Sequence, residues 1–233
     1  MEISTEKLKI EEFDDIQGFN NNIFVIDENN NKQKLCKKIP NLIIRILGDN
    51  NQIILGENLI INGSVNININ GNNININIGN NVKVNKNIYF SFFPEVGSVP
   101  DGSTLAIGDD CLFNGECITF GFGEANTHIK IGKDCLFAGG IKFVTSDDHT
   151  IYDINTKKRL NNPGDIIIGN HCWICADVTV LNNTEISDNS VIGTKSVVTK
   201  KFLEPNLMLA GVPAKVRKEN INWDWRIDNQ KYL

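Results

Sequence analysis

Apolar and polar residues alternate in short segments along the chain. In residues 70–81, NGNNININIGNN, isoleucine occupies every second position between glycine and asparagine residues. A period of two is typical of a β-strand, and glycine and asparagine accept the left-handed backbone angles found in turns. Similar phrases, GFNNNIFVI and GDNNQIILG, begin at Gly18 and Gly48. The pattern predicts strand–turn units that repeat along the chain, with asparagine serving as scaffold at the turns.

A period of six residues dominates the second half of the chain. From Ile168 the sequence divides into IGNHCW, ICADVT, VLNNTE, ISDNSV and IGTKSV, each with an aliphatic residue first and most with a small residue fifth. The same frame fits hexads that start at Leu55, Ile107 and Ile131. A helix cannot produce this period, whereas three hexads of about 18 residues close one coil of a triangular parallel β-helix. Ile168 and Ile186 are then expected to be neighbours in successive coils.

We therefore predict an all-β protein, a parallel β-helix with inserted loops and a short C-terminal tail. Residues 1–45 form an N-terminal segment leading into the first coils, residues 46–218 form the β-helix domain, and residues 219–233 form the tail. The hexad pattern is interrupted by two predicted loops, at 85–106 and 144–167. Insertions in a repeat array leave the wall of the solenoid, and such loops often carry function.

Six cysteines occur in the chain. Four of them take the fifth position of a hexad, Cys111, Cys117, Cys135 and Cys172. We expect these four to pack as small apolar residues rather than to bind a metal or form disulfides. Cys175 takes a second position, so we attribute the CxxC spacing that it makes with Cys172 to the register of the repeat.

Composition narrows the classes of function. A chain of 233 residues with 41% apolar and 22% charged residues can form one sizeable domain. Its net charge of -5 gives no general attraction to nucleic acid or anionic lipid. The N-terminal residues 1–15 are charged where a signal peptide would be apolar, and the apolar runs are too short to span a bilayer. We expect a cytoplasmic protein without membrane insertion.

Three histidines are present. His128 lies in a predicted turn and His171 takes an outward hexad position, so both are predicted to be solvated surface residues. His149 lies in the second inserted loop within SDDHTIYD, among three aspartates. An imidazole in that setting is a candidate general base, because it exchanges protons near neutral pH and a carboxylate can orient it.

Several motifs in residues 143–218 resemble those of a known family. They are DDHTIYD, KRLNNPGDIIIG, HCWICADVTVL, VIGTKSVVTK and AGVPAKVRK, in this order. The set resembles the hexapeptide-repeat acyltransferases, whose fold is a left-handed parallel β-helix. The DxHxIYD loop before the tryptophan-containing coil is most similar to bacterial sugar and polysaccharide O-acetyltransferases, including those that act on capsular sialic acid. The resemblance implies transfer of an acetyl group from acetyl-CoA to a sugar hydroxyl.

The resemblance also implies roles for individual residues. His149 corresponds to the catalytic base, and Trp173 lines the thioester pocket with its indole N–H as a donor, unless it is an ordinary packing residue. Coenzyme A would be contacted by the backbone of Ala176, Thr194 and Thr199 and by the side chains of Lys200, Lys215 and Lys218. A basic cluster near the C-terminal coils supports phosphate binding on charge alone. Cys175 and Lys195 replace glycines that are usual in the family, so we expect a narrower pocket rim.

The acceptor and the assembly are predicted on the same basis. The residues expected to contact the acceptor are Asp148, Tyr152, Lys158 and Arg159. The cationic stretch Lys157, Lys158 and Arg159 would meet the carboxylate of an acidic sugar, or else form part of a solvated loop. Trp223 and Trp225 stack on a sugar or cap the open end of the prism. The family is typically trimeric, so we expect a homotrimer with each site between two subunits.

Three other functions remain open at this point. An N-acetyltransferase for amino sugars would use similar machinery, and a non-catalytic β-solenoid would bind a surface with its flat faces. A carbonic anhydrase of the same fold would need three histidines on a zinc ion, yet His128, His149 and His171 lie on different kinds of segment. We predict no metal.

Overall fold

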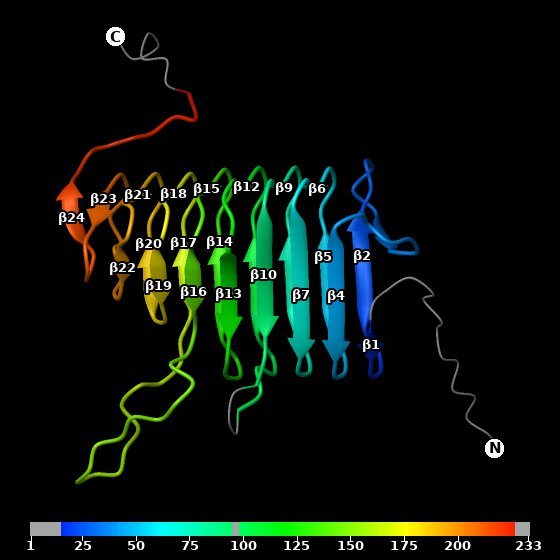
Figure 1. Cartoon of the computed structure of the whole chain (residues 1–233), viewed down its shortest axis with the longest axis horizontal. Coiled ribbons are helices and arrows are strands. Elements are labelled where there is room, and N and C mark those ends of the chain that lie inside the picture. Colours follow the sequence, from blue (N-terminus) through cyan, green and yellow to red (C-terminus); the bar gives the residue numbers. More distant parts are fainter. Residues whose placement is uncertain (1–14, 95–97, 227–233) are drawn as a thin grey trace.

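The computed structural model describes residues 15–94 and 98–226, and all regular structure in these ranges is β. The chain winds into a prism whose coils advance from the blue to the red end of Figure 1, with three eight-stranded sheets as its faces. Face 1 contains β1 (Ile16–Gln17), β4 (Leu42–Leu47), β7 (Ser64–Asn70), β10 (Asn87–Phe92), β13 (Ile118–Phe122), β16 (Lys142–Val144), β19 (Thr179–Leu181) and β22 (Val197–Val198).

The two other faces have the same number of strands. Face 2 contains β3 (Lys32–Lys34), β2 (Asn22–Ile26), β5 (Gln52–Leu55), β8 (Asn75–Ile78), β11 (Thr104–Ile107), β14 (His128–Ile131), β17 (Ile166–Ile168) and β20 (Thr184–Ile186). Face 3 contains β6 (Ile60–Ile61), β9 (Lys83–Val84), β12 (Leu112–Phe113), β15 (Leu136–Phe137), β18 (Trp173–Ile174), β21 (Val191–Ile192), β23 (Met208–Ala210) and β24 (Lys215–Lys218). We call the edge between faces 1 and 2 the first edge, that between faces 2 and 3 the second edge, and that between faces 3 and 1 the third edge.

Pairing between coils is parallel and in the register that the hexads predict. Ile168 pairs with Ile186, as expected from their spacing. Antiparallel strands occur at the ends, where β3 pairs with β2 and β24 pairs with β23. These outer strands cover sheet edges that would otherwise expose unpaired backbone groups.

The core consists of stacked aliphatic and aromatic ladders inside the prism. Phe120 stacks on Phe143 with ring centroids 4.7 Å apart, and Phe113 stacks on Phe137 at 4.6 Å. All four rings are fully buried. Because identical positions of successive coils point to the same interior spot, one repeat rule fills the whole core.

Asparagine ladders run along the turns. The Asn62 amide donates to Asn85 at 2.9 Å and the Asn85 amide donates to Asn114 at 2.8 Å. Asn58 and Asn81 form a similar pair and have φ near +56°. The asparagine-rich segments are therefore scaffold, as their sequence predicts.

Three details differ from the sequence expectations. Parallel coil pairing starts at β1, so the β-helix begins well before residue 46. Strand β10 lies inside the loop predicted at 85–106, so the first part of that predicted loop is a strand of the prism, and residues 95–97 lie outside the described residues. Cys117 is exposed at a turn with φ +58°, so it is not a packing residue, because the hexad around it places its side chain on the outside of the third edge.

The remaining cysteine predictions agree with the structure. Cys111, Cys135 and Cys172 are buried in successive coils, with the Cys172 amide directed at Cys135 Sγ. The pKa of the Cys135 thiol is raised well above its usual range by the neighbouring thiols and by burial. Within the described ranges, no helix is long and apolar enough to cross a membrane.

Candidate active site

His149 is carried by an ordered hairpin that leaves the prism at the first edge. Residues 145–165 connect β16 to β17 and project away from the coils, at the lower left of Figure 1. We call this segment the His149 hairpin. Tyr152 and Arg159 form an antiparallel bridge, and the Leu160 amide donates to Ile151 O at 2.7 Å. The inserted loop is therefore a defined structure rather than an irregular one.

An acidic residue from the preceding coil holds both strands of the His149 hairpin. Arg159 donates from both terminal nitrogens to the carboxylate oxygens of Glu124, at 2.6 and 2.7 Å. The Ser146 hydroxyl donates to the same carboxylate. The Glu124 and Arg159 side chains are only 14% and 28% exposed. This paired geometry fixes the hairpin relative to the prism, and we call it the Glu124 clamp.

The electrostatics of the clamp follow from its contacts. The Arg159 guanidinium, with help from Ser146, lowers the pKa of the Glu124 carboxyl below its ordinary value. The same pairing raises the pKa of Arg159. Arg159 Nε is buried and makes no hydrogen bond among the described residues. Arg159 therefore serves the hairpin, and its charge is not free to bind an acidic acceptor as the sequence reading proposed.

Smaller contacts set the tip and the base of the hairpin. The Asp153 carboxylate closes the tip by accepting from the Thr156 amide at 2.6 Å and from the Asn155 amide at 2.9 Å. These two hydrogen bonds lower the pKa of Asp153. The Asn161 amide group donates to His149 O at 2.7 Å and to Asp147 at 3.0 Å. At the base, the Gly164 amide donates to Thr145 O at 3.0 Å. The backbone around His149 is thus fixed on both sides.

The imidazole of His149 faces solvent. His149 is an exposed residue, and its ring makes no hydrogen bond or ion pair with the described parts of the chain. Asp147 is bonded to Asn161, and Asp153 closes the tip of the hairpin. Neither aspartate therefore orients the ring, contrary to the sequence expectation. The backbone positions the imidazole, which leaves both ring nitrogens accessible to ligands.

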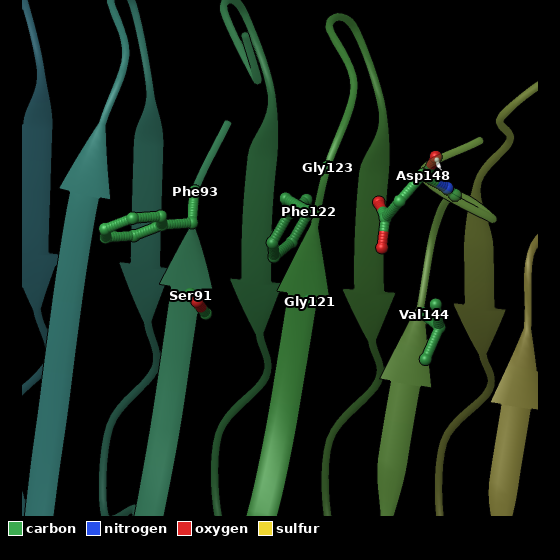
Figure 2. Close-up of a pocket in the computed structure, with 8 residues that line it drawn as sticks. Ser91, Phe93, Gly121, Phe122, Gly123, Val144 and Asp148 are labelled. Carbon is green, nitrogen blue, oxygen red and sulfur yellow. Dashed lines mark hydrogen bonds between the residues drawn. The ribbon is translucent and has the colours of Figure 1, made fainter. Parts of the chain in front are cut away.

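Asp148 packs against the end of β13. Its amide donates to Ser146 Oγ at 2.9 Å, and its φ of +60° turns the chain just before His149 (Figure 2). A side chain at position 123 would collide with the Asp148 carboxylate, so only Gly123 allows this close approach. Asp148 lines a hollow in the surface together with residues of β10 and β13. The acceptor contact that the sequence predicts for Asp148 stays a prediction.

Trp173 lies on face 3, which is opposite the first edge in the triangular section. It is half-buried and lies 5.9 Å, ring to ring, from Trp223 of the tail. His149 and Trp173 of one chain are therefore separated by the width of the prism.

The tail occupies the second edge rather than the end of the prism. Trp223 is 9% exposed, stacks on His171 with centroids 4.4 Å apart, and donates from its indole to His171 O at 2.7 Å. His171 Nδ1 lies 2.7 Å from an oxygen of Asp134, and Trp225 donates to that carboxylate at 3.2 Å. His171 is thus covered by the tail and is not a solvated residue, a contact that its local sequence could not show.

The predicted donor-binding residues fall into two groups. Ala176 and Thr194 lie in successive turns of the third edge, where the Lys195 amide donates to Ala176 O at 3.0 Å. Lys215 belongs to β24 beside this edge, opposite Ala210. The structure brings these residues to the same edge, and their contact with a donor stays a prediction.

The second group lies elsewhere. Thr199 and Lys200 are exposed at the first edge, where the Lys200 ammonium lies 5.2 Å from the centre of the Phe202 ring. Lys218 is at the far end of β24, opposite Met208. A single ligand that contacts both groups must cross a face of the prism or lie between two prisms.

Two further predicted acceptor residues are exposed on the hairpin. Tyr152 is exposed with the Lys157 ammonium 5.7 Å from its ring centre, and Lys158 is exposed beside it. His128 begins β14 instead of lying in a turn. Among the residues that the structure describes, no group of three or more His, Cys, Asp and Glu side chains is arranged to hold a metal ion.

Comparison with known proteins identifies the family. No family model matches the chain. A polysialic acid O-acetyltransferase of Neisseria meningitidis is 35% identical over 186 residues, covering 77% of this chain and 78% of the relative. The chain is a hexapeptide-repeat O-acetyltransferase. As a member of this family, the protein is an enzyme that transfers acetyl groups.

Two solved structures have the fold of this O-acetyltransferase. A polySia-specific acetyltransferase superposes with a TM-score of 0.76 at 26% identity, over 93% of this chain and 90% of that one. A polysialic acid O-acetyltransferase superposes with a TM-score of 0.72 at 32% identity, over 92% of both chains. The left-handed parallel β-helix predicted from the motifs is thereby confirmed along nearly the whole length of the chain.

Proposed function

We propose that this O-acetyltransferase transfers the acetyl group of acetyl-CoA to a hydroxyl of a bacterial cell-surface polysaccharide, and that the polysaccharide contains sialic acid. The support for the acceptor is the activity named for the Neisseria meningitidis relative. The observation that carries the mechanism is the exposed His149 ring on a backbone fixed by the Glu124 clamp. A rigid backbone with an unengaged imidazole suits a general base that must meet an incoming hydroxyl.

In the proposed reaction, His149 accepts the proton of the acceptor hydroxyl through a ring nitrogen. The hydroxyl oxygen bonds to the acyl carbon as the carbon–sulfur bond of the thioester breaks. The His149 imidazolium then returns the proton to the departing thiolate, so the ring is neutral again after each turnover. Acetyl-CoA supplies the activated acyl group. Backbone amides or the indole N–H of Trp173 stabilise negative charge on the acyl oxygen.

Donor binding is proposed along the third edge. Ala176 and Thr194 provide backbone groups in successive turns, and Lys215 adds a cation beside them. A row of backbone groups with a basic residue at its end suits the pantetheine arm and the phosphates of coenzyme A. Lys200 and Lys218 would also contact the donor if acetyl-CoA lies between two prisms.

We further propose a homotrimer in the cytoplasm, with each site formed by two subunits. The separation of His149 and Trp173 on opposite sides of the prism supports a shared site, since one chain cannot bring them together. A cyclic arrangement of three prisms gives every hairpin a neighbouring face. Multi-angle light scattering of the purified chain measures the number of subunits.

The decisive experiment combines acetyl-CoA, polysialic acid and the variant His149→Ala, with thiol release and bound ester as readouts. We expect the wild type to form alkali-labile acetyl esters. In His149→Ala we expect turnover to fall by about two to four orders of magnitude with coenzyme A binding retained. His128→Ala is a matched control, because His128 is also exposed and lies outside the hairpin. Unchanged turnover in His149→Ala would remove this ring from the mechanism.

A further inference from the structure

An open groove runs along the second edge of the prism, where face 2 turns into face 3. Its volume is about 530 Å³, and ligand sites usually have volumes of about 300–1,000 Å³. The lining extends from Ile26 of β2 to Asn170 in the turn after β17, and β5, β8, β11 and β14 lie between these strands. With strands about 4.8 Å apart, the groove is about 24 Å long. We call it the second-edge groove.

Glycines line the groove at the start of each turn. Gly56, Gly79, Gly108 and Gly132 take this position in successive coils. A Cβ added to Gly56 would lie 2.3 Å from the backbone of Gly79, and one added to Gly108 would lie 2.7 Å from the backbone of Gly132. Coil stacking therefore requires these glycines whether or not the edge binds a ligand. What the groove recognises is decided by the side chains of its walls.

Two lysines supply the free charge of the groove. Lys130 lines it from β14, Lys133 lines it from the following turn, and both are exposed. Neither ammonium lies within ion-pair distance of a carboxylate in the part of the chain that the structure describes. The lining also contains Asp109, whose carboxylate accepts from the Asn80 amide at 2.7 Å and so belongs to the turn ladder. In a chain with a net charge of -5, the groove thus offers two cations to an anionic ligand.

The other side chains of the walls suit a sugar. Asn77 is exposed on β8, and Asn80 Oδ1 accepts from the Glu57 amide at 2.8 Å, which leaves the Asn80 NH2 group to donate. Ile26 and Ile54 are half-buried and form apolar parts of the wall. Amide groups bond hydroxyls, and apolar side chains pack against the C–H faces of a ligand.

An exposed tryptophan lies beside the C-terminal end of the groove. Trp225 is 41% exposed, and its indole donates to the Asp134 carboxylate at 3.2 Å. Asp134 directly follows the lining residue Lys133, so the indole and the cation lie at the same turn. The ring of a tryptophan can stack on an apolar sugar face. Cations, amides and an aromatic ring are therefore combined along one edge of the prism.

We propose that the second-edge groove binds a stretch of the acceptor polysaccharide away from the sugar unit that is acetylated. The lysines contact carboxylates of acidic sugars, and the amides contact hydroxyls. A groove about 24 Å long fits several units of an extended polymer rather than one sugar. Face 2 separates the groove from the His149 hairpin of the same chain, and the four residues of β14 alone span about 13 Å. This inference rests on the proposed function, because it concerns the same acceptor.

The test compares long polysialic acid with a short sialic acid oligomer on the full chain. Binding of the polymer is measured without acetyl-CoA, and KM is measured for both acceptors. In Lys130→Gln/Lys133→Gln we expect the affinity for polysialic acid to fall about tenfold and its KM to rise by a similar factor, because two exposed ion pairs are lost. KM for the short oligomer and for acetyl-CoA is expected to be unchanged, since the reacting unit and the donor bind elsewhere.

The aromatic end of the groove is tested separately. In Trp225→Ala we expect the affinity for polysialic acid to fall about fivefold, and in Trp225→Phe we expect most of it to be kept, because a ring remains for stacking. Poly-L-glutamate is an anionic polymer without sugar rings. We expect it to bind more weakly than polysialic acid of equal charge, and its affinity should not depend on Trp225.

Lys34→Gln/Lys37→Gln is the matched control for charge. Both lysines are exposed, at the end of β3 and in the segment that follows, and neither lines the groove. This variant loses the same charge as Lys130→Gln/Lys133→Gln. Its affinity for polysialic acid and its KM values should stay within about twofold of the wild type.

Each result bears on the proposal differently. An unchanged affinity and KM for polysialic acid in Lys130→Gln/Lys133→Gln would overturn the polymer site while leaving the proposed function intact. A change in subunit number in that variant would overturn it too, because the groove would then be a contact between copies. Equal binding of poly-L-glutamate would overturn the assignment to a carbohydrate. A wild type that binds polysialic acid through the two lysines but does not acetylate it would support the groove and overturn the proposed function.

Discussion

Replacing Glu124 by glutamine tests whether the clamp holds the His149 hairpin. The change keeps the shape of the side chain but removes the charge that binds both terminal nitrogens of Arg159. Breaking a buried pair costs about 3–5 kcal/mol, and breaking an exposed pair costs at most about 1 kcal/mol. With side-chain exposures of 14% and 28%, this pair lies between those limits, so we expect a loss of about 2 kcal/mol.

The loss should appear as local opening of the hairpin rather than as global unfolding, because the core ladders are untouched. A loss of about 2 kcal/mol raises the ratio of open to closed hairpin about 30-fold. Hydrogen exchange of the Leu160 and Gly164 amides, which are bonded across the hairpin, should accelerate by about that factor. The same opening should lower kcat/KM for acetyl transfer, by about 30-fold at most.

A surface ion pair provides the control. Lys86 and Glu116 are 3.9 Å apart, with side chains 56% and 65% exposed, so Glu116→Gln should leave hairpin exchange unchanged. If Glu124→Gln changes exchange at Leu160 and Gly164 by less than about threefold, the clamp does not hold the hairpin and the reasoning fails.

Three further predictions follow from the same contacts. Because the folded-state pKa of Glu124 is lowered from 4.5, its contribution is fully present above pH 4.5 and is lost as pH falls through the lowered value. Hairpin exchange, corrected for intrinsic rates, should therefore rise only below that pH, and a rise starting near neutrality would contradict this. Iodoacetamide should label exposed Cys117 rapidly and buried Cys135 and Cys172 only on unfolding, as judged by peptide mass spectrometry. Trp223→Ala should free the tail from the second edge, so that trypsin cleaves the bond after Lys218 faster than in the wild type. Equal cleavage rates would show that stacking on His171 does not hold the tail.

The hexad pattern was sufficient to predict the architecture because each coil repeats the same local rule. An aliphatic first position, such as Ile168, needs only its equivalent one coil later, Ile186, to be buried. The burial of Cys135 and Cys172 follows from the same register. Cys117 shows the limit of the rule, since the fifth position of a hexad that includes a sharp turn points outward.

The location of His149, the proposed base, was predictable for a similar reason. His149 lies in a segment that breaks the period, and a break in a solenoid has to form a loop. How that loop is held was not predictable. Glu124 is 35 residues from Arg159, and its own segment, GFGEANTH, has no feature that distinguishes a clamp from an ordinary acidic turn.

The sequence by itself therefore determined the coil and the core ladders, because these depend on neighbours at a constant spacing, and it placed His149 in a loop, because its segment breaks that spacing. The tertiary structure decided the role of Arg159, the stacking of Trp223 on His171 and the placing of His149 and Trp173 on opposite sides of the prism. Each of those features involves residues from segments that are not related by the six-residue repeat. Their contacts arise only after the chain has wound into coils, when inserted loops and the tail pack on surfaces that the repeat has already built.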